Sequence, residues 1–219
     1  MTPPKPEVLL LDLGNVTVRL RLGDFYANLA RACRPPLDPA QVGQFFSDPA
    51  LLHHGYERGQ VSGEAVYGAA RSRFGLELDY RGWLALWNDF FEPNRPMEAL
   101  VARLAPQLRI WGLSNTNAEH LAFLRLHYRV LDRFEGITAS NEAGAAKPEP
   151  AIYRAALRSL GVEPGRVLYL DDVPQYLEGG RALGLQVFHY TFNDSELRAR
   201  LAALGLDPPP LGGGSVLAC

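Results

Sequence analysis

Short apolar runs alternate along the chain with stretches in which apolar residues recur at helical spacing. The apolar runs are rich in Val, Ile and Leu and have the length of buried strands; they cover residues 8–14, 108–115, 136–140, 167–172 and 186–190. Helical spacing lies between them, at residues 96–105, 118–130, 149–160 and 175–183. Because strands that alternate with helices pack as a parallel sheet between helices, the pattern predicts an α/β fold with a Rossmann-like, five-stranded parallel sheet.

The stretch between the first two predicted strands is too long for a single crossover. Residues 18–94 contain several amphipathic segments and no pattern typical of a strand, so we expect an inserted α-helical subdomain, the helical insertion, over the carboxyl end of the sheet. Trp83 and Trp87, four residues apart, are expected in its core. The predicted α/β core comprises residues 1–17 and 95–207, and the helical insertion comprises residues 18–94. Residues 208–219 are predicted to form a flexible Pro/Gly-rich tail.

Charge and cysteine content narrow the classes of function. A formal net charge of -2 offers no basic surface for a nucleic acid. No apolar stretch reaches the roughly 20 residues that a membrane span needs, and the first residues lack the basic character of a signal peptide. The two cysteines, Cys33 and Cys219, make no disulfide framework. These features predict a cytoplasmic protein that binds neither nucleic acid nor a membrane.

Reactive polar residues stand at the end of four predicted strands or soon after them. They are Asp12, the pair Ser114 and Asn115, Lys147, and the pair Asp171 and Asp172. The carboxyl ends of parallel strands meet at one edge of a sheet, where ligands bind. Each residue alone can be interpreted as a helix cap or a solvated side chain, but together they predict one site. Pro148, directly after Lys147, is expected at the first position of the next helix.

The residue types in this site favour phosphoryl transfer. Clustered carboxylates repel one another, and the hard oxygen ligands of Asp12, Asp171 and Asp172 suit Mg²⁺. A lysine ammonium can meet a phosphoryl oxygen, and Lys147 is one of two lysines beside 20 arginines. A carboxylate can also be a nucleophile and form an aspartyl-phosphate. Positioning and charge neutralisation then supply most of the catalysis.

The order of these motifs resembles that of the haloacid dehalogenase-like (HAD) hydrolase superfamily. The segments "LLLDLGNV", "IWGLSNTN", "AAKPEPAIYRAAL" and "VLYLDDVPQYLEGGRALG" stand in the order of its four motifs. The likeness extends to about residue 192, and the helical insertion stands where a sugar-phosphate phosphatase branch carries a helical cap. The resemblance implies an Mg²⁺-dependent phosphatase of a small phosphorylated metabolite, working as a monomer or homodimer.

The resemblance also implies a role for each motif residue. The expected catalytic residues are Asp12, which attacks phosphorus, and Ser114 and Lys147, which neutralise the phosphoryl oxygens. The expected Mg²⁺ ligands are Asp12, Gly14 through its backbone carbonyl, Asp172 and Asp171. The expected phosphate-binding residues are Asn15, Ser114, Asn115 and Lys147.

Two positions depart from the family pattern. Gly14 stands where many members carry an aspartate that acts as general acid and base, and Tyr176 stands where the fourth motif often has asparagine. Gly14 has a conformational interpretation, a sharp turn that glycine permits. It also has a functional one, the absence of a general acid that is typically worth about 10²–10⁴-fold. An ester with an acidic leaving oxygen then suits the site, which favours sugar 1-phosphates.

Other functions stay open at this point. The missing acid is compatible with a catalytically weak or inactive protein that binds a phosphometabolite or has a regulatory role. It is also compatible with a mutase, which transfers a phosphoryl group between sugar hydroxyls. Cleavage of a carbon–halogen bond by Asp12 is disfavoured, because the Asp171–Asp172 pair indicates a metal that this reaction does not need. Residues of the helical insertion considered as substitute acids or contacts to a sugar are His53, His54, Tyr56, Glu57 and Asn88. Arg19 and Arg21 are considered either as contacts to substrate anions or as solvated cations.

Overall fold

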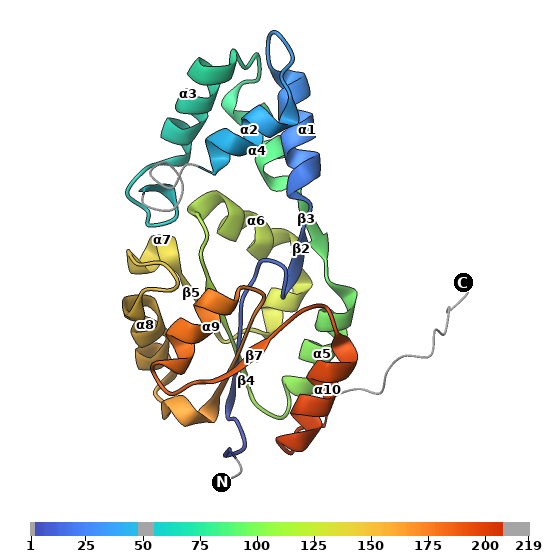
Figure 1. Cartoon of the computed structure of the whole chain (residues 1–219), viewed down its shortest axis with the longest axis vertical. Helices are drawn as coiled ribbons and strands as arrows, with labels where there is room; N and C mark the ends of the chain where they lie inside the picture. The colour runs from blue at the N-terminus through green and yellow to red at the C-terminus, as the bar shows by residue number, and fades with distance from the viewer. Residues whose placement is uncertain (1–2, 48–54, 208–219) are drawn as a thin grey trace, which may run out of the picture.

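The computed structural model describes residues 3–47 and 55–207 of the chain (Figure 1). In this part of the chain, five parallel strands form the main sheet in the order β5-β4-β1-β6-β7. Their bounds are Val8–Leu11 (β1), Arg109–Ser114 (β4), Gly136–Ala139 (β5), Val167–Asp171 (β6) and Gln186–His189 (β7). Each strand falls within a predicted apolar run, and the predicted α/β fold with a parallel sheet is confirmed.

Helices cover both faces of this sheet. Their bounds are Arg95–Leu104 (α5), Ala118–His127 (α6), Ser140–Ala143 (α7), Pro150–Leu160 (α8), Pro174–Arg181 (α9) and Asp194–Ala203 (α10). Leu9 and Leu11 of β1 share a hydrophobic cluster with residues of α5, α6 and α10, whereas Val8 and Leu10 share one with residues of α8 and α9. All four residues are fully buried, because successive side chains of a central parallel strand point to opposite, covered faces.

The course of the chain brings the ends of three strands together. From β1 the chain passes to β4 and β5 on one side of the sheet, and it then returns to β6 and β7 on the other. Strand β1 pairs in parallel with both β4 and β6. The residues that follow β1, β4 and β6 therefore lie beside one another, at the point where the strand order reverses and where open α/β sheets bind their ligands.

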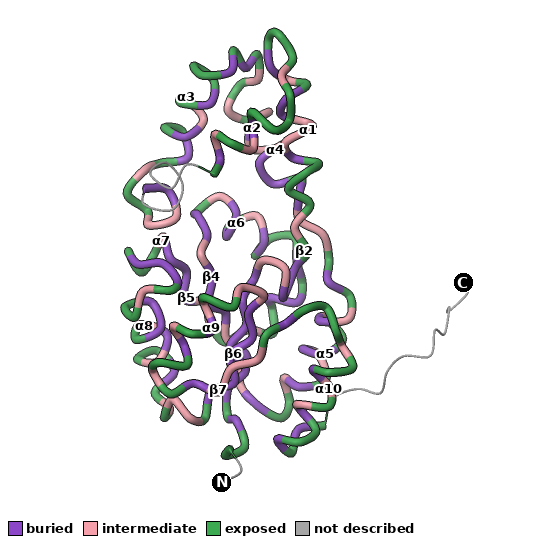
Figure 2. The backbone as a smooth tube through the Cα atoms, in the orientation of Figure 1, coloured by how far each residue is buried: buried purple, intermediate pink, exposed green. Residues whose placement is uncertain are grey.

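Within the helical insertion, the helices build a hydrophobic core of their own, seen above the sheet in Figures 1 and 2. Their bounds are Leu22–Ala32 (α1), Pro39–Phe46 (α2), Gly63–Phe74 (α3) and Tyr80–Asn88 (α4). Trp83 and Trp87 stack with ring centroids 5.1 Å apart and are buried in this core, as predicted. Ser62 caps α3 by accepting a hydrogen bond from the backbone N–H of Ala65. The boundaries drawn for the insertion and the α/β core stay a prediction.

The expectation that residues 18–94 contain no strand is wrong. Val18–Leu20 (β2) and Phe91–Pro93 (β3) pair in antiparallel fashion at the two ends of the helical insertion. Each strand has three residues, too few for an alternating pattern to show in the sequence. Leu20 and Phe91 pack against the core of the sheet and against the core of the insertion, so the ribbon joins the two units.

The expected start of one helix needs correction, and one helix lies where the sequence analysis expected none. Helix α8 begins at Pro150, so Pro150 and not Pro148 occupies its first turn. Helix α10 lacks a strong apolar stripe and was not predicted; it is held by Leu197 and Leu201, which are buried against the sheet. The predicted tail, residues 208–219, lies outside the described residues. Among the described helices, none has the length and apolar character needed to cross a membrane.

Candidate active site

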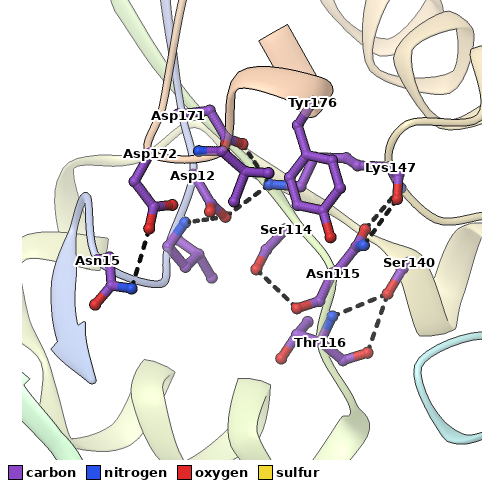
Figure 3. A network of polar contacts seen from close by, with 12 residues as sticks. Asp12, Asn15, Ser114, Asn115, Thr116, Ser140, Lys147, Asp171, Asp172 and Tyr176 are labelled. Atoms are coloured by element: carbon purple, nitrogen blue, oxygen red, sulfur yellow. Dashed lines mark hydrogen bonds and ion pairs between the residues drawn. The ribbon is translucent and has the colours of Figure 1, made fainter. Parts of the chain in front are cut away.

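The predicted reactive residues lie together at the carboxyl edge of the sheet (Figure 3). Asp12 directly follows β1, Ser114 is the last residue of β4, and Asp171 is the last residue of β6. Lys147 reaches the same point from the segment between α7 and α8. The exposed fractions of Asp12, Lys147 and Ser114 are 7%, 4% and 3%. Charges in such a shielded place interact more strongly than on the surface.

Lys147 joins two buried carboxylates. Its Nζ atom lies 2.9 Å from Oδ1 of Asp12 and 2.7 Å from Oδ2 of Asp171. Burial alone would lower the pKa of Lys147, but the two carboxylates outweigh burial and raise it. Lys147 is therefore a fixed positive charge at neutral pH, beside the carboxylate that is the candidate nucleophile.

Asp171 and Asp172 are adjacent in sequence but have different surroundings. Asp171 is fully buried, and its carboxylate accepts hydrogen bonds from the Tyr169 hydroxyl, the Lys147 ammonium and a backbone N–H. Asp172 is partly exposed, and one of its oxygens accepts a 3.0 Å hydrogen bond from Nδ2 of Asn15. Asp171 thus positions Lys147, whereas Asp172 retains the access to solvent that a metal ligand needs.

The acidic residues of the site fit a divalent cation. Carboxylate oxygens of Asp12, Asp171 and Asp172 lie within 4.8 Å of one another. Burial raises the pKa of Asp12 to about 7; Lys147 opposes this shift, while Asp171 and Asp172 add to it. Burial also raises the pKa of Asp172. Since one ammonium does not offset three carboxylates, a hard cation such as Mg²⁺ would supply the missing positive charge.

The two asparagines predicted to bind phosphate have their side chains engaged elsewhere. Asn115 accepts a 2.7 Å hydrogen bond from the backbone N–H of Lys147 and donates a 3.1 Å one to the backbone oxygen of Lys147. Asn15 donates to Asp172. Each asparagine would therefore offer a phosphate its backbone N–H. Within the described part of the chain, Oγ of Ser114 makes one long hydrogen bond, 3.4 Å to the backbone oxygen of Asn115, which a phosphoryl oxygen can replace.

The turn after β1 uses Asn15 as its left-handed residue. Asn15 has a φ of 53°, whereas Gly14 is not among the residues with positive φ. The conformational interpretation of Gly14 is therefore wrong, because its backbone does not require glycine. A Cβ atom at Gly14 would lie 3.1 Å from Cδ1 of Leu20, so the position is tight but accepts a side chain if Leu20 shifts slightly. The absence of an acid at this position is the interpretation that remains.

A cavity of about 400 Å³ lies between this edge of the sheet and the helical insertion. Gly14, Ser114 and Asn115 line it from the sheet, and Tyr56 and Glu57 line it from the insertion. A molecule bound in the cavity would therefore touch the loops that carry the reactive residues.

The other polar residues considered from the sequence either contact other parts of the protein or lie outside the described residues. Asn88 is buried and donates a 2.9 Å hydrogen bond to the Leu84 oxygen, so its amide serves α4. Arg19 lies over the ring of Phe192, 4.9 Å from its centroid. Arg21 forms ion pairs with Asp24 and Glu92 at 2.5 and 2.8 Å, which supports the interpretation as a partly solvated cation. His53 and His54 lie outside the described residues.

Side chains that the sequence analysis, apart from Tyr56, did not single out hold the helical insertion against the sheet. Glu119 of α6 accepts hydrogen bonds from the hydroxyls of Tyr56 and Tyr80, at 2.5 and 3.3 Å. Arg58 forms an ion pair with Glu149. No local pattern marks these contacts, because the partners are far apart in sequence and only the tertiary structure brings them together.

The comparisons with known proteins agree with this geometry. Residues 22–184, well over half of the chain, match the haloacid dehalogenase-like hydrolase family. The chain belongs to this family. The matched range contains Ser114, Lys147 and Asp171 and begins after Asp12.

Related proteins of this family cover most of the chain. Haloacid dehalogenase-like hydrolase domain-containing protein 3 of Danio rerio is 27% identical over 202 residues, 82% of this chain and 81% of that protein. The sesquiterpene phosphatase astK of Aspergillus oryzae is 25% identical over 139 residues, 62% of this chain and 70% of that protein. The chain spans smaller shares of other curated relatives, such as 33% of the drimenol cyclase drtB of Aspergillus calidoustus.

A solved HAD-family structure has the same fold. The HAD family enzyme of Bacteroides thetaiotaomicron, in complex with magnesium and inorganic phosphate, superposes with a TM-score of 0.72 at 24% identity. The superposition covers 86% of this chain and 96% of that chain.

Two tyrosines support the HAD-like site beyond the motif residues. Tyr169 stands two residues before Asp171 on β6, so both side chains lie on the same face of the strand; this spacing is the signal that would have found it. The ring of Tyr176 lies over Lys147, with its centroid 4.9 Å from Nζ, an arrangement that stabilises a cation. Tyr176, which stands at the position of the fourth motif that often carries asparagine, thus lies beside Lys147.

His120 joins the helical insertion to α6 in its neutral form. Its Nε2–H donates to the Trp87 oxygen at 2.9 Å, so Nδ1 accepts the hydrogen bond from Asn117, also at 2.9 Å. Burial lowers the pKa of His120 from 6.5 to about 3. Below pH 6.5 the imidazole of His120 binds a proton in the unfolded chain but stays neutral in the folded protein. The free energy of unfolding therefore decreases as the pH falls below 6.5.

We expect this histidine to lower the free energy of unfolding by about 2 kcal/mol at pH 5 relative to its value well above pH 6.5. Urea unfolding at pH 8 and pH 5 measures the difference. His120→Gln should remove this component, and His127→Gln, at an exposed position of the same helix, should retain it. An equal pH dependence in all three proteins would show that His120 is not the group responsible.

Proposed function

We propose that this HAD-like hydrolase is an Mg²⁺-dependent phosphatase of a small phosphate ester and works through an aspartyl-phosphate at Asp12. The observation that carries the proposal is the pairing of the Asp12 carboxylate with the Lys147 ammonium, 2.9 Å apart, beside a cavity at the sheet edge. Relatives named as phosphatases, among them astK of Aspergillus oryzae, support it. So does the Bacteroides thetaiotaomicron structure, which holds magnesium and inorganic phosphate.

The surroundings of Asp12 distinguish its two oxygens. Oδ1 accepts a 2.7 Å hydrogen bond from the Leu13 N–H and contacts Lys147. Among the described residues, no donor contacts Oδ2, so Oδ2 is the oxygen available for attack. The pKa of about 7 means that burial opposes the ionised nucleophile, and a bound divalent cation would stabilise the charged form that the reaction needs.

The reaction then consists of two displacements at phosphorus. Oδ2 of Asp12 forms a bond to phosphorus, and the bond between phosphorus and the ester oxygen breaks. The ester oxygen leaves with the electron pair and takes a proton from water to give the alcohol. Lys147 and Ser114 stabilise the charge on the phosphoryl oxygens. The oxygen of a water molecule next forms a bond to phosphorus, and the bond between phosphorus and Oδ2 breaks. This regenerates the Asp12 carboxylate and releases inorganic phosphate, which keeps or gives up the protons of the water. The ligands proposed for Mg²⁺ are Asp12, the Gly14 carbonyl and Asp172, with Asp171 nearby, since its carboxylate already accepts hydrogen bonds from the protein.

The leaving group is the second part of the proposal. Because position 14 carries no acid, the departing oxygen must accept its proton from water, and an acidic leaving oxygen lowers this barrier. The anomeric oxygen of a sugar 1-phosphate has this property, which is the reason the sequence favours such an ester. The second candidate function, a weak or inactive protein that binds a phosphometabolite, rests on the same missing acid.

The organisation around the site is also proposed. We assign the helical insertion, residues 18–94, the role of a cap over residues 1–17 and 95–207; the contacts of Glu119 and Glu149 with the insertion support this assignment. A cytoplasmic location and a monomeric or homodimeric state stay predictions of the sequence.

Phosphate release from a panel of small esters tests the proposed function. The panel contains sugar 1-phosphates, sugar 6-phosphates and aryl phosphates, each assayed with Mg²⁺ and again with an excess of EDTA. The proposal predicts release that EDTA abolishes and that Mg²⁺ restores. Binding of esters without release from any of them would support the inactive binding protein instead.

Gly14→Asp tests whether the missing acid limits turnover. We expect the variant to raise kcat on esters of poor leaving groups, such as sugar 6-phosphates, by about tenfold or more, since a well-placed acid typically contributes about 10²–10⁴-fold. Gly14→Asn is the control, because the asparagine side chain has nearly the same shape as that of aspartate but donates no acidic proton. In both variants the new Cβ atom would lie 3.1 Å from Cδ1 of Leu20. An equal rate for the two folded variants would mean that another group already supplies the proton.

A further inference from the structure

Among the described residues, much of the cavity lining that comes from the helical insertion is apolar. Aromatic and aliphatic side chains from the helical insertion and its connecting ribbon form this apolar wall: Leu20, Leu22, Phe25, Phe46, Trp87 and Phe91. The part of a phosphate ester beyond its phosphate would occupy this space, since Gly14 and Ser114 line the same cavity at the sheet edge.

Most of the polar side chains that line the cavity, among the described residues, already bond to the protein. Both ends of the Asn115 amide bond to the backbone of Lys147. Asn117 and both ring nitrogens of His120 are used in the link to Trp87. The Tyr56 hydroxyl donates to Glu119. These groups would have to give up a partner in order to bind a ligand hydroxyl.

A sugar is poorly matched to such a wall. Each hydroxyl that leaves water without a new hydrogen bond costs about 1–3 kcal/mol, and a hexose carries several of them. Among the described residues, Tyr26, Glu57 and Thr116 also add polar groups to the lining. These are fewer than the hydrogen-bond partners that the several hydroxyls of a hexose require. An apolar group gains from the same wall, because apolar surface removed from water stabilises the complex.

We propose that the substrate is a phosphate monoester of an apolar, aromatic alcohol, an aryl phosphate, bound with its ring between the helical insertion and the sheet. The inference rests on the proposed phosphatase function and replaces the sugar 1-phosphate as the favoured ester. The apolar wall selects the ring, and Gly14 selects the oxygen: a phenolic oxygen is acidic enough to leave without a general acid. The phosphorus–oxygen bond breaks, the aryloxide keeps the electron pair, and it takes its proton from water.

Steady-state kinetics on three esters test the proposal: 1-naphthyl phosphate, phenyl phosphate and glucose 1-phosphate. Both aryl esters release a phenolic oxygen, so the difference between them reports apolar contact and not leaving-group chemistry. We expect KM to be lower for the naphthyl than for the phenyl ester by about fivefold, and lower than for glucose 1-phosphate by about tenfold or more. A KM for glucose 1-phosphate equal to or below that of the naphthyl ester would overturn the inference.

Two exposed leucines provide a matched pair of variants. Leu22 lines the cavity and is 41% exposed, whereas Leu126 is 75% exposed and lies outside the lining, so neither change should unfold the protein. Leu22→Asn should raise KM for 1-naphthyl phosphate by about fivefold, and it should not raise KM for glucose 1-phosphate, because the new amide can pair with a hydroxyl. Leu126→Asn should change neither value. Equal KM values for the naphthyl ester in both variants would contradict a ring bound against Leu22.

A binding measurement separates failure of the inference from failure of the proposed function. Calorimetric titration of the Asp12→Asn protein gives the Kd of each ester without turnover. One outcome is that the native protein releases no phosphate from any ester while 1-naphthyl phosphate still binds more tightly than glucose 1-phosphate. That result would contradict the proposed phosphatase function and support the proposed class of apolar ligand. If glucose 1-phosphate binds as tightly, or neither ester binds, the ligand class is wrong.

Discussion

Replacing Asp12 by asparagine is expected to abolish phosphate release, with a loss of about 10⁴-fold or more in kcat. The reason is that Asp12 is the only proposed nucleophile, and removal of a nucleophile costs several orders of magnitude even when binding survives. The side chain sits at the end of β1 with one oxygen held by Lys147 and the Leu13 N–H, so an amide of the same shape cannot attack phosphorus. Phosphate release at saturating ester and Mg²⁺ measures the effect.

The control for this prediction is a second change from aspartate to asparagine. Asp132 is exposed, and its long contact with Arg129, 3.4 Å, is a surface ion pair of a kind worth little. Asp132→Asn should keep full activity and the unfolding midpoint of the native protein. Retention of more than about a tenth of the activity by a folded Asp12→Asn protein would show that the reaction does not pass through an aspartyl-phosphate at this residue.

Replacing Lys147 by methionine is expected to have the largest effect on stability. Lys147 is 4% exposed and is paired with two buried carboxylates. Methionine fills a similar volume but leaves both carboxylates without their ammonium, and removing one partner of a buried pair costs about 3–5 kcal/mol. We expect this loss in the free energy of unfolding, measured by urea at pH 8, together with a loss of at least about 10²-fold in kcat.

The pH dependence of this loss has a definite sign. Burial already raises the pKa of Asp12 to about 7 against the opposing effect of Lys147, so without the ammonium this pKa should rise further above its value in the unfolded chain. Groups shifted in this direction contribute stability at low pH and lose it as the pH rises. The deficit of Lys147→Met should therefore shrink between pH 8 and pH 5. A constant deficit would mean that Lys147 acts only through its packing.

Lys5→Met is the matched control, since Lys5 is the other lysine of the chain and is exposed. We expect the free energy of unfolding of this variant to stay within about 0.5 kcal/mol of the native value. A larger loss would show that removing a lysine charge from this protein is destabilising wherever it stands, and the effect at Lys147 would then need a different explanation.

Local signals in the sequence identified most of the fold because they repeat within each element. The runs at 8–14 and 167–172 are apolar along their whole length since both faces of a central parallel strand are buried, and β1 and β6 lie inside them. Strands β2 and β3 were missed because three residues are too few for a period, and because the contacts of Leu20 and Phe91 that hold them come from two different hydrophobic cores.

By itself, the sequence determined the family, the α/β fold and the set of residues at the carboxyl edge of the sheet, because strand ends that carry polar groups converge whenever the sheet is parallel. Only the tertiary structure decided how these residues divide their work. Asp171 and Asp172 are neighbours in the sequence, yet one is saturated with donors and the other is partly exposed. The tertiary structure also decided the character of the cavity, because the lining combines side chains from distant segments. Asn115 and Tyr56, which the sequence suggests as contacts to a ligand, are hydrogen-bonded within the protein instead.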